Sequence, residues 1–174
     1  MNDEILATAI ALLAATPARW VTLVRAAPLE VLVMKPALTE WSALECLQHL
    51  VETERLAMPV RLKALLAEQS FPGFTPAQHG SSGLPTRELA DEFSQLRQEN
   101  LAVLAHVTAA DLAKRALHAE YGVVTLREFL HHWVGHDLMH TVQAERALLQ
   151  PFIRGCGPWH VNYTEHRVLP PAEQ

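Results

Sequence analysis

The feature that most limits the folds open to this chain is the spacing of its apolar residues, which follows a helical period over four long segments. In the segment from about residue 3 to residue 26, for example, Leu6, Ile10, Leu13 and Trp20 lie on one side of a helix. No stretch of useful length alternates between apolar and polar residues, although "YGVVT" is compatible with a short extended piece. The pattern therefore predicts an all-α protein.

Two of the predicted helices begin at capping boxes. Ser42 and Glu45 have the required spacing, and so have Thr125 and Glu128. In a capping box each of the two side chains satisfies a backbone N–H group that the first helical turn leaves without a partner. We expect these helices to continue to about residue 69 and to about residue 149, just before Pro151.

Prolines lie inside two of the predicted helices. Pro17 falls within the first helix and Pro59 within the second. A proline in a helix interior removes one backbone hydrogen bond, so we expect a bend or a split at Pro17 and a kink at Pro59. The third helix, from about residue 86 to residue 107, contains no proline.

The segment between the second and third helices is long and has no helical pattern. Its sixteen residues, 70–85, read "SFPGFTPAQHGSSGLP". Fully extended, such a segment reaches roughly 50 Å, whereas a helix over residues 42–69 is about 40 Å long. It can therefore cross the whole bundle, which predicts a four-helix bundle with one long crossover between helices 2 and 3. We expect residues 1–174 to form one such domain, with a frayed tail from about residue 165.

Composition narrows the classes of function. The net charge of −5 gives no electrostatic basis for binding nucleic acid or an anionic membrane. The N-terminal apolar run, residues 5–18, is shorter than a bilayer requires and follows the acidic residues Asp3 and Glu4, so it suggests neither a membrane span nor a signal peptide. Only two cysteines are present, which is typical of a cytoplasmic protein.

Histidines are concentrated in the fourth predicted helix, where residues 131–140 read "HHWVGHDLMH". At about 100° per residue, His136 and His140 share one side of the helix with Phe129 and Trp133, which is the side expected to face the bundle interior. His132 lies at the edge of this side. His131 points away from it and is expected to be exposed.

Two inward histidines one helical turn apart can bind one cation, or they can be satisfied by hydrogen bonds. A third histidine, His49, lies among mixed polar and apolar positions of the second helix. If the two helices face each other, His49, His136 and His140 supply three ligands and leave positions open for water or substrate, as catalytic zinc sites do. The spacing alone keeps both interpretations open.

Several stretches in succession resemble landmarks of the DinB superfamily (the DinB/YfiT-like proteins), a group of metal-dependent proteins. They are "EWSALECLQHLVETE", "FPGF", "LRQENLAVL", "YGVVTLREFLHHWVGHDLMHTVQAERAL" and "GPW", in the expected order from about Leu12 to Trp159. The combination of a Trp-Ser helix start, a histidine eight positions after that tryptophan and a late HxxxHxxQ is specific, although each motif alone is weak.

The resemblance implies a commonly dimeric four-helix bundle with one long crossover and a divalent metal, zinc or nickel first and iron or manganese as alternatives. Carried over residue by residue, the ligands fall on His49, His136 and His140. Relatives use low-molecular-weight thiols as nucleophiles in transfer and isomerisation reactions, so a thiol transferase or a hydrolase with a small-molecule substrate is expected.

Residues near these histidines are candidates for supporting roles. A metal-bound imidazole usually donates its second N–H to an oxygen atom, and Glu45, His132 and Gln143 lie at suitable helical positions for contact with the ligands. Glu52, one turn after His49, is the only candidate for a general base. For each of them a solvated or packing role is an equal alternative.

Three competing hypotheses remain at this level. "HDLMH" is similar to the HExxH motif of zinc peptidases, with Asp137 in place of the catalytic glutamate. The second hypothesis is that Cys46, three residues before His49, is a metal ligand or a nucleophile; the alternative is that it only packs in the core. The third hypothesis is a non-catalytic, dimeric metal-binding bundle with a structural or stress-related role, against which the open coordination of three histidines argues.

Overall fold

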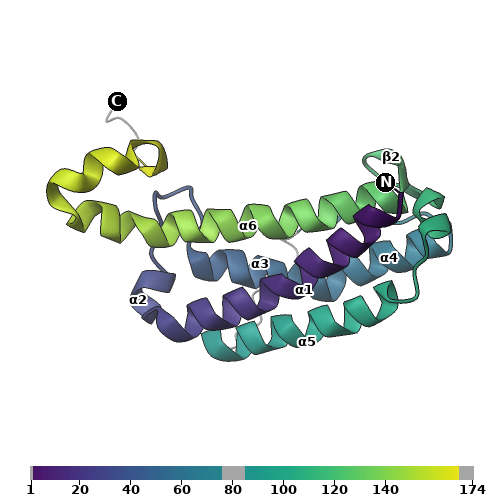
Figure 1. Cartoon of the computed structure of the whole chain (residues 1–174), viewed down its shortest axis with the longest axis horizontal. Helices are drawn as coiled ribbons and strands as arrows, with labels where there is room; N and C mark the ends of the chain where they lie inside the picture. Colours follow the sequence, from purple (N-terminus) through teal and green to yellow (C-terminus); the bar gives the residue numbers. More distant parts are fainter. Residues whose placement is uncertain (1, 76–84, 169–174) are drawn as a thin grey trace.

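The protein is a bundle of long helices with a small β-hairpin at one end (Figure 1). The computed structural model describes residues 2–75 and 85–168. Its elements in chain order are α1 (Asn2–Ala26), α2 (Leu29–Leu32), α3 (Ala43–Leu56), α4 (Met58–Leu66), α5 (Thr86–Leu104), η2 (Ala109–Ala113), β1 (Arg115–His118), β2 (Gly122–Thr125), α6 (Leu126–Gly155) and η3 (Gly157–His166).

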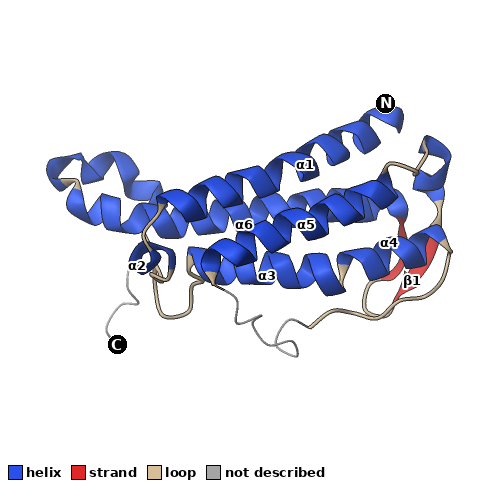
Figure 2. Cartoon of the chain, turned by 90° about the horizontal axis from the view of Figure 1, so that it is seen from below, coloured by secondary structure: helices blue, strands red, loops and turns tan. Residues whose placement is uncertain are grey.

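The helix directions confirm the predicted bundle with one long crossover. α3 and α4 run toward the hairpin end of the molecule, and α5 runs in the same direction, whereas α1 and α6 run the opposite way (Figure 1). Each of α1 and α3 packs against both α5 and α6. The end of α4 and the start of α5 therefore lie at opposite ends of the bundle (Figures 1 and 2). Most of the predicted crossover, residues 76–84, lies outside the described residues.

Both predicted capping boxes are present. The Ser42 hydroxyl accepts from the Glu45 backbone N–H, and the Thr125 hydroxyl does the same for Glu128, while each glutamate accepts from the cap backbone. The predicted kink at Pro59 is a break two residues earlier, at Ala57, where α3 ends and α4 begins. Pro59 occupies the first turn of α4, where its missing N–H costs no internal bond.

Several helix boundaries differ from the prediction. α1 is not split at Pro17, and by length and composition it could span a membrane, contrary to the estimate from its apolar run alone. In the bundle, however, it packs against α5 and α6. The fourth helix, α6, continues through Pro151 to Gly155 instead of ending near residue 149. Pro151 removes one backbone bond, but the buried Gln150 and Ile153 keep this last part of α6 packed.

The hairpin was predicted only in part. The extended piece "YGVVT" is β2, but its partner β1 was missed because its four residues carry no pattern of their own. The strands pair antiparallel, with Arg115 opposite Thr125 and His118 opposite Gly122. Phe71, at the start of the crossover, bridges to His118 in parallel fashion.

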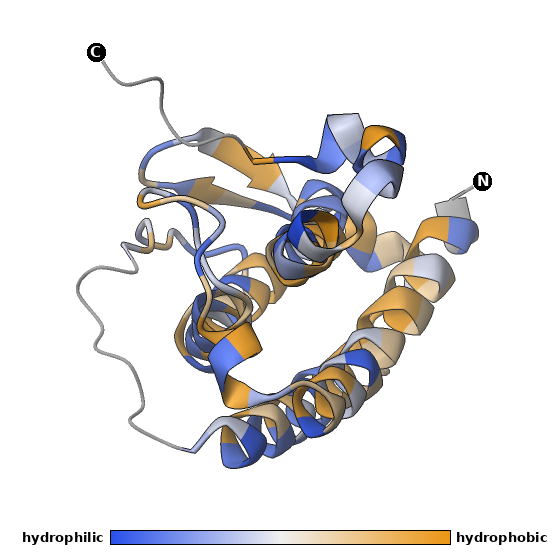
Figure 3. Cartoon of the chain, turned by 90° about the vertical axis from the view of Figure 1, so that its left-hand side faces the viewer, coloured by the Kyte–Doolittle hydropathy of each residue, from blue (hydrophilic) through white to orange (hydrophobic). Residues whose placement is uncertain are grey.

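Each long helix carries both hydrophobic and hydrophilic residues, as the view along the bundle shows (Figure 3). The hydrophobic residues form two core clusters. One includes Leu13, Leu62 and Trp133 and lies toward the hairpin, and the other includes Trp20 and Phe93 and lies toward the opposite end. Along their helices, buried polar residues fall between members of the two clusters, close in sequence to the histidines of α3 and α6: Thr16 in α1, Glu54 in α3, Arg97 in α5 and Asp137 in α6.

Candidate metal centre

α6 presents a row of histidines at successive turns. His132, His136 and His140 are four residues apart, so each lies roughly one turn, about 6 Å, beyond the last. The ring centroids are 5.9 Å apart for the first pair and 4.6 Å for the second. His131 is exposed, as predicted, while His140 is 5% exposed.

α3 contributes His49 to the same place. Its Nε2 atom lies 3.0 Å from Nε2 of His136, and its ring centroid is 4.6 Å from that of His140. One nitrogen from each of the three rings lies within 4.8 Å of the other two. In the part of the chain that the structure describes, this is the one group of three or more histidine, cysteine or carboxylate side chains with such spacing.

The donor set and its spacing fit a divalent cation. Nitrogen ligands about 2.1 Å from one ion, at angles between 90° and 110°, are roughly 3 to 3.4 Å apart. The pair His49 and His136 already has this separation, and small side-chain movements would bring His140 to it. Imidazole nitrogens suit zinc, nickel, copper and iron.

The three rings are uncharged at neutral pH. Burial, together with the neighbouring His140 ring, lowers the pKa of His49 to about 4. Burial and the neighbouring histidines lower the pKa of His136 to about 3. Burial also lowers the pKa of His140, against a hydrogen bond with Gln143 that raises it. A lone pair on each ring is therefore available to a cation without the loss of a proton.

Trp41 forms one wall of the cluster, a role that sequence reasoning missed. Its ring stacks on His140 with centroids 5.4 Å apart and an interplanar angle of 11°, and it meets His49 edge-on at 5.1 Å. The position is set by the helix start, because Trp41 immediately precedes the Ser42 cap of α3. This apolar wall excludes water from one side of the imidazoles.

The three residues predicted to support the ligands lie in different surroundings. Gln143 is brought to the cluster, since its Oε1 lies 2.9 Å from Nδ1 of His140. Glu45 is not, because its carboxylate accepts from the Ser42 backbone and pairs with Lys35. Nε2 of His132 lies 3.2 Å from a guanidinium nitrogen of Arg61.

The Glu52 carboxylate and the Nδ1 atom of His136 are two further groups near the cluster. Glu52 is partly buried one turn after His49, and its carboxylate is not one of the three grouped ligands. Nδ1 of His136 is buried and has no hydrogen-bond partner among the described residues. The orientation of the His136 ring therefore depends on its Nε2 side, which faces His49.

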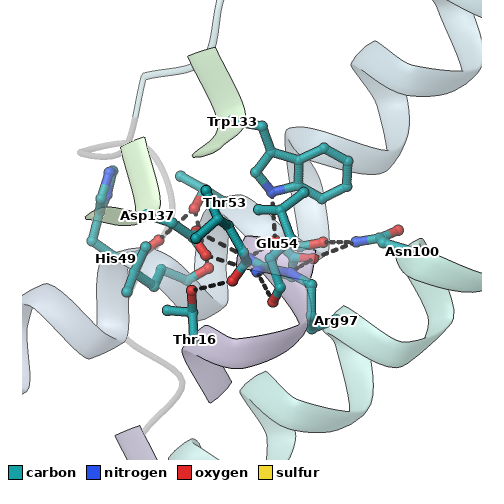
Figure 4. Close-up of polar contacts among 11 residues, drawn as sticks. Thr16, His49, Thr53, Glu54, Arg97, Asn100, Trp133 and Asp137 are labelled. Carbon is teal, nitrogen blue, oxygen red and sulfur yellow. Dashed lines mark hydrogen bonds and ion pairs between the residues drawn. The ribbon is translucent and has the colours of Figure 1, made fainter. Parts of the chain in front are cut away.

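A buried ionic network lies beside His49 in the bundle interior (Figure 4). Arg97 on α5 binds both carboxylate oxygens of Glu54 and both of Asp137, at 2.7 to 2.9 Å. All three residues are at most 2% exposed. Asn100 and the Trp133 indole also donate to Glu54.

The charged side chains of the network stabilise one another through direct contacts. Burial alone would lower the pKa of Arg97, but hydrogen bonds with Glu54 and Asp137 raise it above its ordinary value. Burial raises the pKa of Asp137 despite the guanidinium beside it. Sequence reasoning missed Glu54 and Arg97; the available signal was that Arg97 follows Phe93 by four residues on the apolar side of α5.

The structure disfavours two of the competing hypotheses. Asp137 is bound to Arg97, so its carboxylate does not serve the histidine cluster as the glutamate of an HExxH motif would. Cys46 is fully buried in the hydrophobic core, and burial raises the pKa of its thiol to about 12. A thiol with such a pKa is not a nucleophile at neutral pH, and Cys46 is not part of the three-histidine group.

Comparison with known proteins gives two findings. The family model of the DinB superfamily matches residues 12–144. Among solved structures, the chain is similar to YfiT from Bacillus subtilis, with a TM-score of 0.72 and 16% sequence identity over 82% of this chain and 85% of that one. YfiT is described as "a probable metal-dependent hydrolase with an unusual four-helix bundle topology". None of the curated proteins matches the chain in sequence.

Proposed function

The chain belongs to the DinB superfamily, and we propose from this premise that it is a metal-dependent enzyme whose His49, His136 and His140 hold a divalent cation. The observation that carries the proposal is the convergence of three neutral imidazoles from two helices, with one nitrogen of each within 4.8 Å of the others. A hydrogen bond between two imidazoles would explain only one pair of rings whose nitrogens lie this close together. The third ring favours a cation.

Three protein ligands are the number that catalytic metal sites use, whereas structural zinc sites have four. No carboxylate or thiol of the described residues joins the three rings as a fourth ligand. Imidazole nitrogens suit zinc, nickel and iron. The order proposed for the metal, zinc or nickel first with iron and manganese as alternatives, follows from the resemblance to the family. When bound, such a cation lowers the pKa of a coordinated water or thiol and so supplies a nucleophile near neutral pH.

The residues around the rings would prepare the site for this chemistry. The amide oxygen of Gln143 accepts from Nδ1 of His140, which leaves Nε2 of that ring with its lone pair. Trp41 keeps water from one side. Glu52, one helical turn from His49, is our candidate for the general base.

For the reaction we propose attack on a small-molecule substrate by water, as in a hydrolase, or by a low-molecular-weight thiol, as in a transferase. The description of YfiT as a metal-dependent hydrolase supports the first. The thiol reaction follows from the sequence resemblance, and a homodimer in the cytoplasm likewise stays a prediction. A non-catalytic bundle that uses its metal for stability is the alternative.

Metal content tests the proposal directly. Purified protein should contain about one divalent ion per chain by elemental analysis, and His49→Ala and His136→Ala should each lose it while circular dichroism shows an unchanged helical fold. His131→Ala is the matched control, because His131 lies on the same helix but is exposed. Stoichiometric metal in both ligand variants would refute the site. Metal-loaded protein should then be screened with ester and amide substrates, with and without added thiols.

A further inference from the structure

A pocket of about 220 Å³ lies at the hairpin end of the bundle, between α4, the β-hairpin and the first turns of α6. The lining residues that carry rings are Phe71, His118, Tyr121, Phe129 and His132. The surface that the pocket presents is almost wholly apolar. Because an apolar cavity of about 150 Å³ can hold one benzene molecule, this pocket has room for a benzene ring with a substituent.

The aromatic walls are held in place by contacts within the protein. The ring of His118 meets that of Phe71 edge-on, with centroids 5.0 Å apart, and lies 4.6 Å from that of Tyr121. Phe129 is 5% exposed, and its ring lies 5.4 Å from the buried Trp133. A pocket whose walls are already ordered loses little conformational freedom when a ligand enters.

The charged residues at the pocket have other partners. One guanidinium nitrogen of Arg61 lies 3.2 Å from Nε2 of His132. One carboxylate oxygen of Glu128 accepts from the backbone N–H and the hydroxyl of Thr125, in the capping box of α6. Arg61 and Glu128 therefore contribute mainly the carbon atoms of their side chains to the lining.

His118 likewise contributes its ring and not a hydrogen-bonding group. Its Nδ1 accepts from the backbone N–H groups of Glu120 and Tyr121 at 3.0 and 3.3 Å, and its Nε2 is buried. Burial lowers the pKa of His118, so the ring is uncharged near neutral pH. A ligand in the pocket therefore meets uncharged ring surfaces on this side.

Such walls select against charge and favour hydrocarbon. Water in an apolar pocket finds few hydrogen-bond partners, so its replacement by an apolar group is favourable. A charged group would lose its hydration without gaining a partner. Aromatic walls also suit a ring, because they can contact it edge-on or stacked.

We propose that this pocket binds an uncharged apolar group of about the size of a benzene ring, carried by a small molecule. His132 lines the pocket, and its ring centroid lies 5.9 Å from that of His136. The pocket therefore ends one helical turn before the three-histidine cluster, and its ligand is the apolar part of the substrate. This last identification rests on the proposed function, whereas binding in the pocket does not require the metal.

Two matched probes test the chemistry of the pocket. Toluene and benzoate carry the same ring, but only benzoate is charged. Isothermal titration of chelator-treated protein should show one toluene bound per chain, with benzoate at least tenfold weaker because the lining offers its carboxylate no partner. Equal affinities for the two probes, or no toluene binding, would overturn the proposal.

Two neighbouring valines locate the site. Val124 lines the pocket from β2, whereas Val123 is 64% exposed on the other face of the strand. Val124→Phe puts a ring into the pocket and should weaken toluene binding at least tenfold, while Val123→Phe should leave it unchanged. Undiminished toluene binding in a folded Val124→Phe protein would refute the site. If this variant does not fold, the comparison of toluene with benzoate in the wild type still decides the proposal.

A paramagnetic ion tests the position of the pocket beside the metal. Copper(II) accelerates the nuclear relaxation of nearby protons, and zinc does not. Toluene protons should therefore relax faster with copper-loaded than with zinc-loaded protein, and His49→Ala should abolish this difference while it retains toluene binding. Toluene binding without the difference would refute the assignment of the ligand to the substrate. Toluene binding by a protein that takes up no metal would support the pocket while the proposed function fails.

Discussion

The Nδ1 atom of His140 lies 2.9 Å from the Oε1 atom of Gln143, three residues further along the same helix. This contact holds the ring in the state in which Nδ1 carries the proton and Nε2 has a free lone pair. The contact joins a candidate supporting residue directly to a proposed ligand, whereas Glu45 is committed to the cap of α3.

Removal of this contact should weaken metal binding. In Gln143→Leu, the acceptor for His140 is lost, and we expect the affinity for zinc to fall by about 10- to 100-fold. Competition with a chromophoric chelator measures the effect. Gln143→Glu retains an oxygen acceptor and should bind zinc about as tightly as the wild type. Equal affinity of the leucine variant would mean that the hydrogen bond does not support a ligand.

Arg97 should be essential for stability. Its loss in Arg97→Leu leaves Glu54 and Asp137 as buried carboxylates without a counter-charge, and the free energy of unfolding should fall by about 3 to 5 kcal/mol. Urea denaturation of the chelator-treated protein measures this change. Arg25→Leu is the matched control, because Arg25 pairs with Asp91 on the surface and should contribute less than about 1 kcal/mol. Similar values for the two variants would contradict a central role of the network.

Stability should decrease in acid when no metal is bound. The pKa values of His49 and His136, about 4 and about 3, lie below the ordinary histidine value, so between pH 6.5 and these values the unfolded chain binds more protons than the folded one. The free energy of unfolding then falls as the pH falls from about 6.5 toward 4. Melting temperatures of chelator-treated protein at pH 7.5, 6 and 5 should show this loss.

A variant identifies the buried ring as the source of the acid sensitivity. His136→Gln should lose less stability than the wild type over the same pH range, whereas His131→Gln, whose side chain is exposed, should follow the wild type. Parallel pH profiles for all three proteins would show that the acid sensitivity arises elsewhere.

Removal of metal should leave the fold intact. The two hydrophobic clusters and the Arg97 network contain none of the three proposed ligands, so chelation should preserve the helical circular dichroism signal. Added zinc should raise the melting temperature, since a ligand at 100 times its dissociation constant stabilises the folded state by about 2.7 kcal/mol. Unfolding upon chelation would instead favour the structural alternative to an enzyme.

The elements that could be predicted are those whose cause is local. A helical period and a capping box depend on residues three or four positions apart, which is why the starts of α3 and α6, the break near Pro59 and the inward direction of His136 and His140 follow from the sequence. The end of α6 did not follow, because buried Gln150 and Ile153 outweigh the single bond that Pro151 removes.

Which helix faces contact one another was decided by the tertiary structure alone. Arg97 binds residues 43 and 40 positions away, and its partners depend on how α3, α5 and α6 pack against one another. His118 lies against Phe71 only through the pairing of a four-residue strand that has no pattern of its own. The sequence by itself therefore determined the helices and the directions of single side chains. The packing of the helices determined the three-histidine cluster and the buried charges near it, because contacts between distant segments depend on their relative rotation and not on local spacing.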